Sequence, residues 1–177
     1  MYELTELKNW VSEISQDYLF YLYKRNKDFP WCCHTSANLI TSYLNHHFGE
    51  NIYHKYINTL KSSHGWTQGP DFVIDFTNFQ FYMVDDDKKR IDKQDLDKEQ
   101  LMDILTPYFE IRSPISVSGD RLFKELTLQT HAENMDLYGQ KFVDLNNTPL
   151  SKKHFWYYLR KAHNPVNNKI VKNGYYS

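Results

Sequence analysis

The spacing of the apolar residues changes near residue 50, and this change constrains the fold more than any other feature. Between residues 3 and 25 apolar side chains recur at three- and four-residue intervals, as on one face of a helix (Leu4, Leu7, Trp10, Val11, Ile14, Tyr18 and Leu22). Pro30 interrupts the pattern, because the residue before a proline avoids the helical region. A second stripe predicts a helix from Cys33 to Phe48. Strand-like segments follow it, so the sequence predicts an α+β fold.

The middle of the chain carries the strand signals. Residues 52–60 show partial alternation and many β-branched or aromatic side chains, which is typical of a strand. Two further short strands, 64–68 and 72–77, flank Gly69-Pro70-Asp71, and these turn residues predict a hairpin. Residues 79–84 are predicted to add another extended piece.

The second half of the chain is less informative. Residues 85–100 are strongly charged and are interpreted as an insertion loop within a single domain that spans residues 1–177. Beyond this loop the pattern predicts, in chain order, a short helix 101–105 that ends before Pro107, a strand 108–112, helices 121–130 and 152–162, and a polar tail 165–177 that frays.

Charge and cysteine content exclude some classes of partner and compartment. The formal net charge is −1, which argues against nucleic acid as the main partner, since phosphate binding needs a concentrated positive surface. No stretch is apolar and long enough to cross a bilayer, and the N-terminus does not have the layout of a secretion signal. The two cysteines are adjacent and form no disulfide framework. A cytoplasmic location is therefore expected, although delivery into another cell as an effector would leave no mark in this sequence.

Three residues in chain order have the chemistry of a nucleophilic site. A cysteine becomes a strong nucleophile as the thiolate, which a helix N-terminus and a nearby imidazolium favour. Cys33 opens the second predicted helix, where its backbone N–H is also the predicted donor to an oxyanion. His64 and Asp75 lie on opposite arms of the predicted hairpin and are expected nearly opposite one another. Asp75 is flanked by apolar residues, so its carboxylate needs a partner that offsets its desolvation.

The stretches that carry these residues, 29–40, His64-Gly65-Trp66 and 74–81, resemble the papain-like/transglutaminase-like cysteine fold. They are most similar to small bacterial proteins with a Cys-headed helix, a His-x-Trp strand and an Asp-x-Thr-x-x-Gln-Phe strand. The resemblance implies a Cys-bearing helix packed on a small antiparallel sheet with flanking helices. It also implies acyl transfer at a carbonyl through a thioester, with a Cys-His-Asp triad.

Several assignments at this site stay open. Cys32 is the alternative nucleophile, because Ser36 lies four residues on, as in papain, whereas Ala37 lies four residues after Cys33. Trp66 is predicted either to pack in the core or to wall the cleft beside the histidine. Gln80 recurs in the resembled pattern and is expected either to support the site with a hydrogen bond or to lie on the surface of an alternating strand.

The favoured function is that of a peptidase- or amidase-like cysteine enzyme acting on a protein or peptide substrate. A transglutaminase or protein-glutamine deamidase is one alternative. A non-catalytic binding or immunity-like module is another, and a buried Cys33 or a His64 turned away from it would favour this alternative. No metal site is expected, since adjacent cysteines do not easily chelate one ion and no second cysteine pair exists. No organic cofactor is expected either, because the thiol does the chemistry. No feature predicts an oligomeric state.

Overall fold

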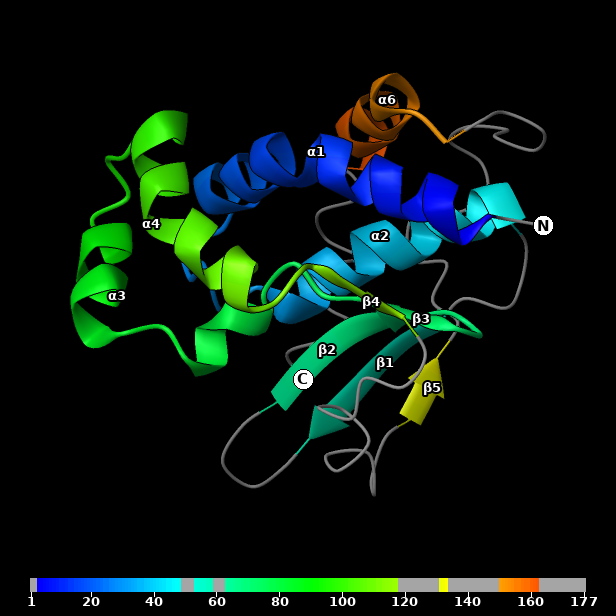
Figure 1. Cartoon of the computed structure of the whole chain (residues 1–177), viewed down its shortest axis with the longest axis horizontal. Coiled ribbons are helices and arrows are strands. Elements are labelled where there is room, and N and C mark those ends of the chain that lie inside the picture. Colours follow the sequence, from blue (N-terminus) through cyan, green and yellow to red (C-terminus); the bar gives the residue numbers. More distant parts are fainter. Residues whose placement is uncertain (1–2, 49–52, 59–62, 118–130, 134–149, 163–177) are drawn as a thin grey trace.

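The protein has a mixed α+β fold in which helices cover one face of a small antiparallel sheet (Figure 1). The computed structural model describes residues 3–48, 53–58, 63–117, 131–133 and 150–162. The expected helix 121–130 and the expected frayed tail 165–177 lie outside these ranges. Within the described ranges, no helix combines the length and the apolar character needed to span a bilayer.

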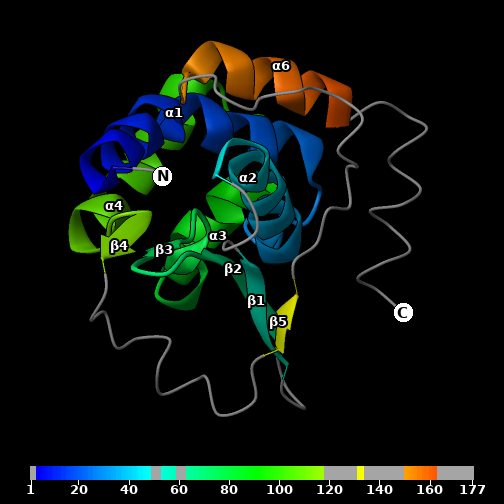
Figure 2. The same cartoon turned by 90° about the vertical axis from the view of Figure 1, so that its right-hand side faces the viewer.

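Helices α1 (Leu4–Arg25), α2 (Cys33–Phe48) and α6 (Lys152–Ala162) form at the places where the apolar periodicity predicted helices. Helix α2 packs directly against β1 and β2. Figures 1 and 2 show α2 lying between the sheet and the pair α1 and α6, which contact one another. The first residue of α2 is thereby placed at the junction of helices and sheet.

The sheet has the strand order β4-β3-β2-β1-β5, with every neighbouring pair antiparallel. Its strands are β1 (Tyr53–Asn58), β2 (Ser63–Gln68), β3 (Phe72–Ile74), β4 (Ile115–Val117) and β5 (His131–Glu133). The predicted hairpin is confirmed as β2 and β3. A Cβ atom at Gly69 would lie 2.1 Å from the Phe72 ring, so this turn needs a glycine. Strand β2, which carries His64, is the central strand.

The segment after β3 does not extend as predicted. Residues Asn78–Phe81 form a single 3-10 turn, η1, in which the Gln80 backbone amide donates to the Thr77 carbonyl oxygen at 3.1 Å. Phe79 and Gln80 are both buried in this turn. An alternating strand buries only every second side chain, so burial of two successive side chains requires the chain to turn.

The charged segment 85–100 is not an insertion loop. It contains helix α3 (Asp85–Asp92) and the start of α4 (Lys98–Ile111). Three aspartates occupy the first turn of α3 and Lys89 and Arg90 the last, so the charges complement the helix dipole. Ile91 is fully buried and attaches the helix to the core. The order of the charges along this segment, acidic first and basic last, indicates a helix, whereas a high density of charge alone does not.

The expected stop before Pro107 and the expected strand 108–112 are also wrong, because α4 continues through Pro107 to Ile111. A capping box between Asp97 and Gln100 begins the helix. Leu101, Ile104, Leu105 and Tyr108 recur at helical spacing and are buried, and the proline is on the exposed side. Packing of this apolar face outweighs the missing amide of the proline.

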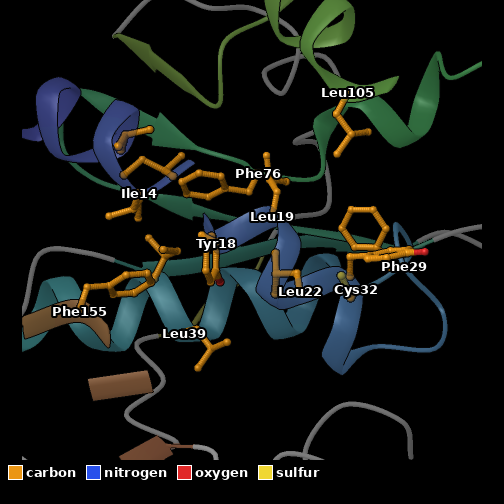
Figure 3. Close-up of a cluster of buried hydrophobic side chains, with 14 of the residues drawn as sticks. Ile14, Tyr18, Leu19, Leu22, Phe29, Cys32, Leu39, Phe76, Leu105 and Phe155 are labelled. Carbon is orange, nitrogen blue, oxygen red and sulfur yellow. The ribbon is translucent and has the colours of Figure 1, made fainter. Parts of the chain in front are cut away.

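One apolar cluster joins the helices to the residues next to the site (Figure 3). Tyr18 on α1 makes edge-to-face contacts with Phe76, which follows β3, and with Phe155 on α6, at ring-centroid distances of 4.9 and 5.2 Å. Phe29 and Cys32, which precede α2, belong to the same cluster. The segments that lead into α2 and out of β3 are thus held by one core.

Candidate active site

The turn that bears Cys33 is attached to the strand that bears His64. The first helical hydrogen bond of α2 runs from the Ser36 amide to the Cys32 carbonyl oxygen at 3.0 Å, so Cys33 opens the helix as predicted. The Thr67 hydroxyl on β2 donates to the Ala37 carbonyl oxygen at 3.1 Å and lies 2.9 Å from the Thr41 hydroxyl. These two buried contacts fix the position of α2 along β2.

His64 and Asp75 form a buried pair. The Nε2 atom of His64 lies 2.6 Å from Oδ2 of Asp75, a short distance that is typical of a charge-assisted hydrogen bond. The hairpin register is not the one expected, however. Thr67 pairs with Ile74, so the next position sets Asp75 opposite Trp66 and makes its contact with His64 diagonal. Asp75 comes directly after β3, which ends at Ile74.

Thr77 holds the other oxygen of Asp75. Its backbone amide donates to Oδ1 at 3.0 Å and its hydroxyl donates to the same atom at 3.2 Å. The backbone amide of Asp75 donates to the Pro114 carbonyl oxygen at 2.7 Å. The sequence assigned no separate role to Thr77, although an Asp followed two residues later by a Thr is the spacing of a side-chain-stabilised turn.

Two further side chains interact with the imidazole of His64. Gln80 Nε2 lies 2.5 Å from Nδ1, and the side chain of Cys33 makes a hydrogen bond to the imidazole. The structure thus brings together Cys33, His64, Asp75 and Gln80, and Gln80 is buried rather than on a strand surface.

Aromatic rings enclose the imidazole. The Trp66 ring stacks beside His64 at a centroid distance of 6.1 Å and an interplanar angle of 25°, and Trp66 is fully buried. The Phe81 ring meets His64 edge-on at 4.6 Å and 79°, and it is half exposed. Trp66 therefore combines the two roles expected for it, core packing and a wall beside the histidine. Phe81 separates the imidazole from solvent.

Burial and charge shift three neighbouring pKa values. Burial by itself lowers the pKa of His64, but the charge and hydrogen bond of Asp75, together with Cys33, outweigh burial and hold this pKa well above its usual value. Burial, and secondarily the charge of His64, lowers the pKa of His34 to about 4, so His34 is neutral. Burial raises the pKa of the Cys32 thiol. Of the two cysteines, Cys32 lies in the apolar cluster and Cys33 contacts the imidazole.

The site has little access to solvent. Cys33 is 5 % exposed and His64 is 2 % exposed. A small void lies between α2 and the β2–β3 hairpin and is lined in part by Cys33, Ala37 and Asp75, but it does not admit a water molecule. A larger cavity of about 270 Å³ lies elsewhere, between α1, α4 and the segment that enters β4.

Comparisons with known proteins do not identify a family. No family model matches the chain, and no curated protein or solved structure matches it. The described ranges also contain no group of three or more His, Cys, Asp and Glu side chains arranged to hold a metal ion. The geometry around His64 is therefore the basis for inferring a function.

Proposed function

We propose that this protein is a cysteine-dependent acyl-transfer enzyme, of peptidase or amidase type, with a papain/transglutaminase-like core. Cys33 is the nucleophile, His64 the general base and Asp75 the residue that orients the base. The observation that carries the proposal is the continuous hydrogen-bonded order of Cys33, His64 and Asp75, with the 2.6 Å contact between His64 and Asp75 at its centre. A cysteine beside a base that a third group orients is the general pattern of an activated nucleophile.

The proposed reaction begins from the ion pair of the Cys33 thiolate and the His64 imidazolium, because the pKa of His64 lies well above its usual value. The thiolate attacks a carbonyl carbon, and the backbone N–H of Cys33 faces the oxyanion that forms, since the first amides of a helix have no acceptor within it. The imidazolium of His64 then protonates the departing amine, which leaves a thioester on Cys33. Asp75 keeps the imidazole in one tautomer and stabilises its charged form throughout.

The choice of Cys33 over Cys32 is supported by the surroundings of the two thiols. Cys33 hydrogen-bonds to His64, whereas Cys32 packs in the apolar cluster with Phe29 and Leu22. An apolar environment raises a thiol pKa and makes a cysteine inert, which is the direction found for Cys32.

The group that resolves the thioester decides the type of enzyme. Water gives a peptidase or amidase, and an amine gives a transglutaminase. A glutamine side chain as acyl donor with water gives a deamidase. Ammonia release from a glutamine-containing peptide, with and without an added primary amine, separates these three outcomes.

A second candidate function has its own support. A non-catalytic binding or immunity-like module predicts a buried cysteine, and Cys33 is 5 % exposed beside a void that does not admit water. The same candidate predicts a histidine turned away from the cysteine, which does not agree with the contact between Cys33 and His64. The reactivity of Cys33 distinguishes the two candidates.

The deciding experiment is the rate of iodoacetamide alkylation against pH, with mass spectrometry locating the modified cysteine. We expect Cys33 to react below the pH at which an ordinary thiol does, and His64→Ala to move the profile to higher pH. The matched control is His154→Ala, a histidine on α6. An ordinary profile at Cys33 that His64→Ala leaves unchanged, in folded protein, would support the non-catalytic module.

A further inference from the structure

We propose that the cavity of about 270 Å³ between α1, α4 and the segment that enters β4 is a binding site for a small organic anion, a carboxylate with an apolar body. The inference does not depend on the proposed reaction, because Cys33, His64 and Asp75 are not among the residues that line this cavity. It goes beyond that reaction by giving the chain a second site.

The cavity has an apolar floor. The floor is made of side chains from both helices and from the segment that enters β4 (Val11, Leu19, Met102, Phe109 and Ile115). Val11 and Leu19 are buried, and the other three are partly buried. A ligand that covers these side chains removes their apolar surface from water, which favours binding. The volume is slightly below the range of about 300–1,000 Å³ that is typical of sites for drug-sized molecules, so the occupant is small.

The rim of the cavity carries a cation and two polar side chains. Lys8, Ser12 and Gln16 follow one another at four-residue intervals along α1 and are exposed. Within the described part of the chain, no carboxylate pairs with Lys8, and no Asp or Glu lines the cavity. The ammonium group therefore favours an anion, to whose oxygens the Ser12 hydroxyl and the Gln16 amide are able to donate. A single cation matches a carboxylate better than a doubly charged phosphate.

The wall that leads into β4 is held from its other side. The Pro114 carbonyl oxygen accepts from the Asp75 backbone amide at 2.7 Å. The Ser113 carbonyl oxygen accepts from the side-chain amide of Asn78 at 3.1 Å. The wall is therefore ordered before a ligand arrives, and a preformed site loses less conformational entropy on binding.

The same hydrogen bonds place a reporter group behind the cavity. Asp75 does not line the cavity, but its backbone amide donates to Pro114, which does. A molecule bound against Pro114 is expected to change the surroundings of this amide. The chemical shift of the Asp75 amide therefore separates binding in the cavity from binding elsewhere on the surface.

The first experiment titrates the full-length protein with octanoate by calorimetry. Octanol and octylamine are the matched probes, because they have the same apolar body without the charge or with the opposite charge. We expect saturable binding of octanoate, weaker binding of octanol and the weakest binding of octylamine. Lys8→Met should weaken octanoate binding about three-fold, the effect of one exposed charge pair, and leave octanol binding unchanged. Lys153→Met, an exposed lysine on α6, is the control and should bind octanoate like wild type.

A second variant and NMR locate the bound molecule. Thr106 on α4 is exposed and lines the cavity, so Thr106→Trp should fill the cavity without disturbing the core and abolish octanoate binding. Thr106→Ser should retain it. In wild-type protein the Asp75 amide signal should move with the same affinity that calorimetry gives. The inference is overturned if octanoate does not bind saturably, if octylamine binds as tightly, if Thr106→Trp binds like wild type, or if the Asp75 signal stays unmoved.

Discussion

Thr77 donates twice to one oxygen of Asp75, from its backbone amide at 3.0 Å and from its hydroxyl at 3.2 Å, and leaves the other oxygen to His64. All three residues are buried. A buried carboxylate without donors is costly, so these hydrogen bonds make an ionised Asp75 tolerable beside the imidazole. The raised pKa of His64 therefore depends on a residue that does not touch it.

Thr77→Val tests this dependence. The variant keeps the backbone donor and removes only the hydroxyl donor, so we expect the free energy of unfolding to fall by about 1 kcal/mol. The profile of Cys33 alkylation should move to slightly higher pH, because a less stabilised Asp75 supports the imidazolium less. Thr77→Ser keeps the hydroxyl and should restore the profile. Loss of stability with an unmoved profile would make Thr77 a purely structural residue.

Asp75→Asn removes the charge that holds the pKa of His64 above its usual value and keeps the shape of the side chain. With the charge gone, the desolvation of His64 dominates, its pKa falls and the thiolate loses its counter-ion. We expect alkylation of Cys33 at neutral pH to slow at least ten-fold. Asp86→Asn, on the exposed surface of α3, is the control and should leave the rate unchanged. Equal effects of the two variants would contradict a role for Asp75.

The pH dependence of stability follows from the same pair. The pKa of His64 rises from 6.5 in the unfolded chain to about 10 in the folded protein, as Asp75 and Cys33 outweigh burial. Between these values the folded state binds more protons, so the contribution of the pair is complete below pH 6.5 and is lost as the pH rises through about 10. The free energy of unfolding in urea should be about 3 kcal/mol lower for Asp75→Asn than for wild type at pH 6, and the difference should be smaller at pH 10. A difference that stays constant between these pH values would contradict the shifted pKa.

Cys32→Ala and Cys33→Ala should have opposite consequences. Cys32 packs in the apolar cluster, so its truncation should cost about 1 kcal/mol of stability and leave alkylation of Cys33 unchanged. Cys33→Ala should abolish the fast alkylation and leave only slow labelling of a buried thiol. Urea unfolding and mass-spectrometric mapping of both variants check the pattern. If the fast labelling is found on Cys32 instead, Cys32 is the nucleophile.

Local features of the sequence predicted the first half of the fold and most of the site. The apolar periodicity predicted α1 and α2, Pro30 and the cysteines located the start of α2, and Gly69 with its neighbours predicted the β2–β3 hairpin. These features depend on backbone preferences and on side-chain spacing within one element, which a sequence displays directly. The lone acidic residue in an apolar run also predicted a buried partner for Asp75, and that partner is His64.

Only the tertiary structure decided the rest. The diagonal contact of His64 with Asp75 depends on where β3 ends, and the burial of Gln80 depends on Phe79 packing between Phe29 and Phe109. Likewise, α4 continues through Pro107 because its apolar face has a core to cover. The physical reason is common to these cases. Local preferences are worth a few tenths of a kcal/mol per residue, whereas burial of one large apolar side chain contributes about 2 kcal/mol and depends on residues far away in the chain.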